Sequence, residues 1–168
     1  MDPRLHSIFA RRSVRKFTDQ TVSEEDLLAL LEAGAAAPSA NNSKPWHFVA
    51  VTERKTLDKL ADILPYGKML YQAPLAIAVC ADPSLSPKYW QQDCAASTEN
   101  ILLAATELGL GAVWLGIYPR EERLAGCRDL LGIPATIETL SVIAVGHPAE
   151  RPEPRTQLEA VRVHREKW

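Results

Sequence analysis

The run LAIAVCA, from Leu75 to Ala81, has an apolar side chain at every position. Successive side chains of a strand point to opposite faces of the sheet, so an uninterrupted apolar run is typical of a strand covered on both faces. Three other short stretches are also mostly apolar: HFVAV (47–51), AVWLG (112–116) and TLSVIAVG (139–146). The sequence therefore predicts strands that are buried between two layers.

Segments with helical periodicity lie between these strands. Ser23 precedes EEDLLALLEAG, where acids occupy the first turn and leucines recur on one face, as at a capped helix start. Further helices are predicted near 57–64, over 91–108 and over 120–132. This alternation of helix and strand predicts a three-layer sandwich of the α/β or α+β class.

Length and charge exclude several classes of protein. The chain has 168 residues, 46% of them hydrophobic, and a net charge of −2, so it lacks the basic balance of a nucleic-acid binder. Its longest charge-free run, 69–81, is too short to span a membrane, and the N-terminus has no apolar signal region. Three widely spaced cysteines argue against disulfides or a zinc site. We expect one reduced, cytoplasmic domain.

Common catalytic motifs are missing from the sequence. The glycines of GLGAVWLG (109–116) precede a strand instead of following one, so they are not a dinucleotide fingerprint. There is no Gly-x-Ser-x-Gly elbow and no His-Glu-x-x-His helix. With no evident nucleophile, metal site or acid–base pair, any chemistry is expected to belong to a cofactor.

The stretch RRSVRKF, 11–17, concentrates positive charge in an otherwise slightly acidic chain. In an extended segment alternate side chains point the same way, so Arg11, Ser13 and Arg15 can converge on one anion. Arg12 would then face a neighbouring part of the same ligand. The alternative is a solvated basic turn, which composition alone favours slightly.

Three other places are candidate ligand contacts. PSANNSKPW (38–46) leads into a strand, and its Asn side chains can bond both donors and acceptors of a heterocycle, although turn chemistry also explains them. Gly116, at a strand end, would let the backbone approach a flat ligand. Arg155 lies in the proline-rich segment 147–168, which has too few apolar residues for its own core and is either a loose tail or an arm.

These pieces together resemble the nitroreductase family of FMN-dependent oxidoreductases. The resemblance rests on four segments in the family's order: RRSVRKF, PSANNSKPW, QQDCAASTENILLAATELGLGAVWLG and VIAVGHPAERPEPR. It implies a single α+β domain over residues 1–168, with a three-layer α/β/α architecture. It also implies an intertwined homodimer with two FMN sites at the interface, in which the arm 147–168 reaches around the partner.

The resemblance also implies roles for individual residues. Arg11, Ser13 and Arg15 match phosphate and ribityl contacts, and Arg12 matches a position near the pyrimidine edge of the flavin. The family has a loop that approaches the flavin from the other subunit, and the residues that match it here are Pro38, Ser39, Ala40 and Asn42. Leu115 and Gly116 match the backbone segment beside the flavin ring and phosphate. Arg155 matches a basic residue near the end of the family's sequence that contacts the phosphate. Lys44 stands where the family usually has Gln and is expected to face solvent or the phosphate.

The activity implied by the resemblance is ping-pong oxidation of NAD(P)H, with nitroaromatics, quinones or similar molecules as acceptors. The flavin would carry the chemistry, so no catalytic side chain and no metal is expected, and neither nucleic acid nor a membrane is an expected partner. Related folds perform reductive dehalogenation or break down flavin. Two alternatives are not enzymes. One is a flavin-binding sensor or store without turnover, and the other is a dimeric adaptor that binds no flavin.

Overall fold

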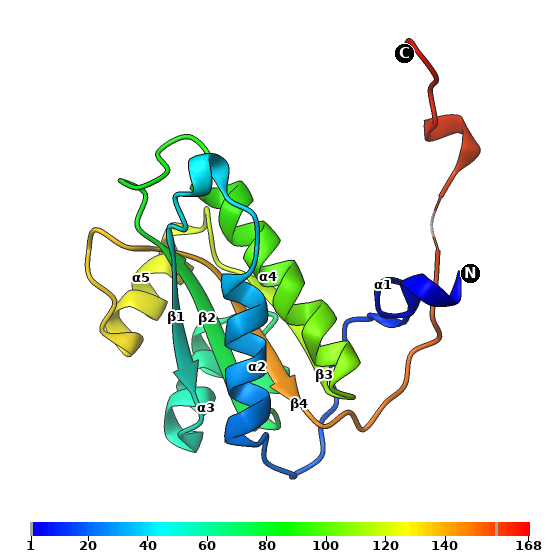
Figure 1. The fold of residues 1–168 in the computed structure, drawn as a ribbon. Coiled ribbons are helices and arrows are strands. Elements are labelled where there is room, and N and C mark those ends of the chain that lie inside the picture. The colour runs from blue at the N-terminus through cyan, green and yellow to red at the C-terminus, as the bar shows by residue number, and fades with distance from the viewer. Residues whose placement is uncertain (1, 157) are drawn as a thin grey trace.

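The structure, a computed structural model, describes residues 2–156 and 158–168 (Figure 1). The strands are β1 (Trp46–Val51), β2 (Leu75–Ala81), β3 (Gly111–Gly116) and β4 (Glu138–Gly146). The α-helices are α1 (His6–Ala10), α2 (Glu24–Ala35), α3 (Arg54–Ile63), α4 (Trp90–Glu107) and α5 (Glu121–Leu131). Short 3-10 turns are η1 (Pro3–Leu5), η2 (Ala40–Asn42), η3 (Lys68–Tyr71) and η4 (Ala160–Arg162).

The strands form one sheet in the order β1-β2-β4-β3, and every neighbouring pair is antiparallel. An antiparallel sheet with helices packed on it belongs to the α+β class, which decides between the two classes that the helix–strand alternation allows. The two central strands, β2 and β4, pair over almost their whole length, from Leu75 opposite Val145 to Ala81 opposite Glu138.

Helices cover both faces of this sheet, as the apolar run of β2 predicts. Leu75, Ile77 and Val79 pack in one core with α2 and α4, and the alternate β2 residues pack in a second core with α3 and α5. Every residue of β2 is at most 1% exposed. Figure 1 shows α2 and α4 side by side over the sheet. The three-layer α/β/α prediction is confirmed.

Most helix and strand boundaries predicted from local sequence patterns lie close to those of the structure. The Ser23 hydroxyl accepts a hydrogen bond from Asp26 N at 3.0 Å, which caps α2 as its sequence indicates. The predicted helix near 57–64 ends one residue early, because Leu64 has an extended backbone, although its side chain remains buried. None of the helices in the described ranges is long and apolar enough to cross a bilayer.

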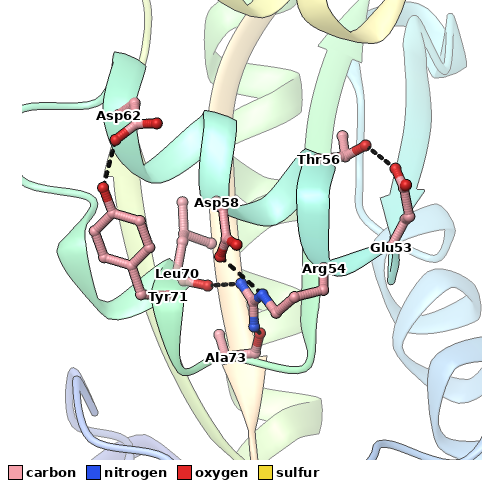
Figure 2. A network of polar contacts seen from close by, with 8 residues as sticks. All are labelled: Glu53, Arg54, Thr56, Asp58, Asp62, Leu70, Tyr71 and Ala73. Carbon is pink, nitrogen blue, oxygen red and sulfur yellow. Dashed lines mark hydrogen bonds and ion pairs between the residues drawn. The ribbon is translucent and has the colours of Figure 1, made fainter.

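Arg54, at the start of α3, ties this helix to the segment that precedes β2 (Figure 2). Its Nη1 donates to the Ala73 carbonyl at 3.0 Å, and its Nη2 donates to the Leu70 carbonyl. Its Nε also lies 2.8 Å from an Asp58 carboxylate oxygen. Nearby, the Tyr71 hydroxyl donates to Asp62. Arg54 thus donates to one carbonyl within η3 and to another just after it, and so holds the connection between α3 and β2.

Replacing Arg54 with Ala is expected to lower the free energy of unfolding by about 1–3 kcal/mol, because two partly buried carbonyls lose their donor. Asp58→Ala is the matched control, since it removes only an exposed ion pair worth about 0.5 kcal/mol. Urea denaturation of both variants tests this difference. Equal losses in the two variants would show that the carbonyl contacts contribute little.

The three cysteines are free thiols in the core. Burial raises the pKa of Cys94 to about 12 and that of Cys127 to about 12, and it also raises the pKa of Cys80. Unfolded thiols ionise near pH 8.5. The folded state therefore keeps protons that the unfolded state releases, and this contribution to stability is present below pH 8.5 and lost as the pH rises toward 12.

The free energy of unfolding should consequently fall between pH 8.5 and 11. Urea denaturation at several pH values measures this slope for the wild type. The variant with Cys94→Ala and Cys127→Ala should show a shallower slope, since two of the titrating groups are gone. An identical slope in both proteins would assign the fall to other groups.

Candidate functional site

The arginine-rich stretch near the N-terminus pairs with the segment that follows β4. The contacts run in antiparallel order: Thr18 N to the His147 carbonyl at 2.9 Å, Ala149 N to the Lys16 carbonyl at 2.9 Å, Arg15 N to Glu150 Oε1 at 2.7 Å and Arg155 N to the Phe9 carbonyl at 3.1 Å. In Figure 1 the chain after β4 passes alongside α1. We call this arrangement the chain-end pairing; it brings both ends of the sequence to one edge of the molecule.

The same stretch is also attached to the sheet. Val14 N donates to the Ala112 carbonyl of β3 at 3.0 Å, and Ser13 forms an isolated parallel bridge with Ala112. A Cβ on Gly111 would lie 2.6 Å from the Val14 side chain, so a glycine is needed for this close approach. The extended backbone that the alternation of Arg11, Ser13 and Arg15 requires is therefore present.

Arg11 and Arg155 line one cavity of about 380 Å³. The other lining residues are Ile8, Phe9, Thr156 and Leu158. Arg11 Nε lies 2.8 Å from Glu99 Oε1 of α4. The Nε atom is buried and its N–H does not point at a hydrogen-bond acceptor, so this contact is an ion pair only. A cavity lined by two arginines and a threonine is suited to an anion such as phosphate.

The other polar residues of this stretch do not line that cavity. The Arg12 guanidinium donates to the Glu153 carbonyl, within the chain-end pairing. Arg15 is exposed, and its backbone N–H, not its side chain, contacts Glu150. Ser13 is half-buried beside β3. Arg11, Ser13 and Arg15 are predicted to converge on one anion. Within one protomer, only Arg11 of these three lines the cavity, and it does so together with Arg155.

The second candidate segment, 38–46, folds over the start of α4. Pro38, Ser39 and Ala40 line a cavity of about 390 Å³ together with Tyr89, Gln92, Asp93 and Ala96. Ala40 N donates to Asp93 Oδ1 at 2.9 Å, and the Ser86 hydroxyl donates to Asp93 Oδ2 at 2.7 Å. Asp93 is only 5% exposed. Its carboxylate holds this loop against α4, a role that sequence reasoning missed, although an acid on the buried face of a helix was a usable signal.

The backbone of this loop has an unusual conformation. Asn41, Asn42 and Lys44 have φ of 54°, 54° and 48°, in the left-handed region that non-glycine residues rarely adopt. Asn tolerates this region better than most residues, whereas Lys does not. The Ser39 hydroxyl accepts from Lys44 N at 3.0 Å, which stabilises the turn. The side chains of Asn42 and Lys44 are exposed.

Leu115 and Gly116 line a third, smaller cavity of about 150 Å³ at the end of β3. A Cβ on Gly116 would meet no atom within 4 Å, so the backbone there is accessible to a ligand. Arg123 of α5 donates to the Gly116 carbonyl at 2.8 Å, and its guanidinium lies 5.9 Å from the centre of the Tyr66 ring. Sequence reasoning identified neither Arg123 nor Tyr66, because both contacts are made only in the folded protein.

Seven of the predicted site residues therefore line three separate cavities of one protomer, whereas Arg12, Ser13, Arg15, Asn42 and Lys44 line none of the three. Arg11 and Arg155 share the first, the 38–40 segment lines the second, and Leu115 with Gly116 lines the third. In residues 2–156 and 158–168, no three His, Cys, Asp or Glu side chains are placed to hold a metal ion.

Replacing Asp93 with Ala should release the 39–44 loop, since Ala40 N and the Ser86 hydroxyl lose their common acceptor. We expect the free energy of unfolding to fall by about 1–3 kcal/mol and the Ala40 amide to exchange hydrogen faster. Asp93→Asn keeps one acceptor oxygen and should have a smaller effect. Unchanged exchange at Ala40 in the Ala variant would contradict the role of Asp93.

The sequence matches a family model described as the nitroreductase family, over residues 8–66 and 64–147. A protein of Archaeoglobus fulgidus, provisionally named NADH dehydrogenase/NAD(P)H nitroreductase, is 49% identical over an alignment that covers all of both chains. More than half of the present chain thus matches one family.

Solved structures agree with this result. A crystal structure from Parabacteroides distasonis, with the same provisional name, has a TM-score of 0.96 and 40% identity, and each chain covers 100% of the other. A provisionally named nitroreductase of Desulfovibrio desulfuricans, solved in complex with FMN, has a TM-score of 0.85 and 34% identity, over 100% of this chain and 99% of that one.

Proposed function

This chain belongs to the nitroreductase family, and we propose on that basis that it passes electrons from NAD(P)H to nitroaromatic, quinone or similar acceptors by a ping-pong mechanism. The protein is an oxidoreductase, and its cofactor is FMN. The finer statements, namely the acceptor, the order of the half-reactions and the residues that hold FMN, are proposals.

The observation that carries the proposal is the cavity that Arg11 and Arg155 share. FMN ends in a dianionic phosphate, and moving that charge away from water is costly unless cations and hydrogen-bond donors replace the water. Two arginines and Thr156 line one cavity of about 380 Å³ beside the chain-end pairing. Arg11 contacts Glu99 through Nε, so its terminal nitrogens are the donors that would meet a phosphate, and the residues present fit that group.

The remaining contacts are proposed in keeping with the family's pattern. Ser13 and Arg15 would complete the phosphate and ribityl contacts, and Arg12 would lie near the pyrimidine edge. The open backbone at Leu115 and Gly116 would lie beside the ring, where a side chain on residue 116 would intrude. In this arrangement Lys44 is expected to face solvent or the phosphate.

We further propose a homodimer whose two FMN sites combine residues of both copies. Pro38, Ser39, Ala40 and Asn42 would come from the second copy, which accounts for the separate cavity that the first three of them line in a single protomer. The C-terminal arm supports the same conclusion. Its first part, 147–155, is fixed to its own chain, whereas beyond it Leu158, Val161 and Trp168 are 80%, 78% and 100% exposed. Such apolar side chains need a cover, which a partner would supply.

When bound, FMN supplies the ability to accept a hydride from NAD(P)H and to give up the electrons to an acceptor. The protein's own contribution is then binding, orientation and electrostatics. Arg11 and Arg155 offset the phosphate charge, Gly116 permits close approach of the backbone, and Arg12 would offset negative charge at the pyrimidine edge. No side chain of the chain has to act as an acid or base.

The test is an absorbance spectrum of the purified protein with FMN, followed by anaerobic addition of NADH and then NADPH. We expect a bound-flavin spectrum that bleaches with at least one donor, faster than free FMN under the same conditions. Addition of a quinone or a nitroaromatic should restore the colour. Bound flavin that stays oxidised with both donors would instead indicate a flavin store or sensor. Absence of bound flavin would refute the phosphate assignment.

A further inference from the structure

Glu99 of α4 is the acidic residue that contacts Arg11, one of the residues that line the proposed phosphate cavity. Its Oε1 lies 2.8 Å from Arg11 Nε, and the two side chains are 42% and 31% exposed. Neighbouring residues on α4, Thr98 and Ile101, are fully buried, so the helix that carries Glu99 is firmly packed. The carboxylate is thus attached to a rigid element, whereas Arg11 follows the short helix α1.

An arginine that binds an anion gains from being held in place beforehand. A free arginine side chain has many rotamers, and it loses this conformational entropy when the guanidinium is immobilised on a ligand. Arg11 also shares its cavity with Arg155, so without an anion the two like charges disfavour each other's presence. A carboxylate beside Arg11 counteracts both effects, since it offsets one charge and restricts the side chain.

The geometry leaves Arg11 able to bind an anion at the same time. Glu99 Oε1 contacts the Arg11 guanidinium at Nε, whereas the two terminal nitrogens are the remaining donors of the group. Those two nitrogens form the fork that binds two oxygens of a phosphate. Glu99 and a phosphate can therefore occupy different edges of one guanidinium.

We propose that Glu99 is a positioning residue, which holds the Arg11 guanidinium at the cavity wall so that its terminal nitrogens are ready for the FMN phosphate. This inference rests on the proposed function, because it takes the anion to be that phosphate. The competing possibility is that Glu99 repels the phosphate or must be displaced by it. The two possibilities predict opposite changes in FMN affinity when the carboxylate is removed.

The experiment compares dissociation constants for FMN and for riboflavin, which lacks the phosphate, by flavin fluorescence quenching on the full-length apoprotein. In Glu99→Ala we expect FMN to bind about two- to fivefold more weakly, the range for a partly exposed ion pair, and riboflavin to bind as before. Glu99→Gln retains an acceptor oxygen and should fall between wild type and Ala. Glu107→Ala, at the exposed end of the same helix, is the matched control and should change neither constant.

A double-mutant cycle with Arg11 links the effect to its partner. Arg11→Ala should weaken FMN binding, and adding Glu99→Ala in that background should have no further effect. Tighter FMN binding in both Glu99 variants would overturn the proposal in favour of repulsion. Equal weakening of FMN and riboflavin would overturn it in favour of a purely structural role. Unchanged FMN affinity in Arg11→Ala would refute the phosphate site itself, and the role of Glu99 with it.

Discussion

The rest of the structure depends on the complete burial of β2. A strand with apolar side chains on both faces cannot leave either face to water, so the chain must supply helices on both sides. It does so with α2 and α4 on one face and α3 and α5 on the other. This arrangement also determines where the connections lie, because the segments that join helices to strands emerge at the ends of the layers and carry the candidate site.

The chain-end pairing brings together the two arginines of the proposed phosphate site. Arg11 and Arg155 are far apart in sequence, and two cations brought to one cavity repel each other unless something offsets their charge. Backbone hydrogen bonds between residues 9–18 and 147–155 hold the two segments together. Glu99 supplies negative charge at the same place from a rigid helix. In the proposed phosphate site, the cations are thus positioned by contacts within the chain itself.

The helix α4 connects two parts of the proposed site. Asp93, in its first turn, fixes the loop that carries Ser39 and Ala40, and Glu99, two turns on, contacts Arg11. The loop keeps Asn41, Asn42 and Lys44 in left-handed conformations, which persist only where the surroundings enforce them. Since Asp93 and Glu99 lie on the same helix, their relative positions are set by the packing of α4 in the core and not by flexible loops. A second copy would bring its own pair of groups in the same arrangement.

The sequence by itself determined the layers, the strands and most helix boundaries, because burial and capping are local patterns that adjacent residues reveal. It also singled out Arg11, Gly116 and Arg155 as candidates through residue type and family resemblance. Only the tertiary structure decided the antiparallel strand order, the meeting of Arg11 with Arg155, and the contacts made by Asp93, Glu99 and Arg123. The physical reason is that these contacts join residues distant in the chain, and no local pattern specifies which distant partner a charged side chain will meet.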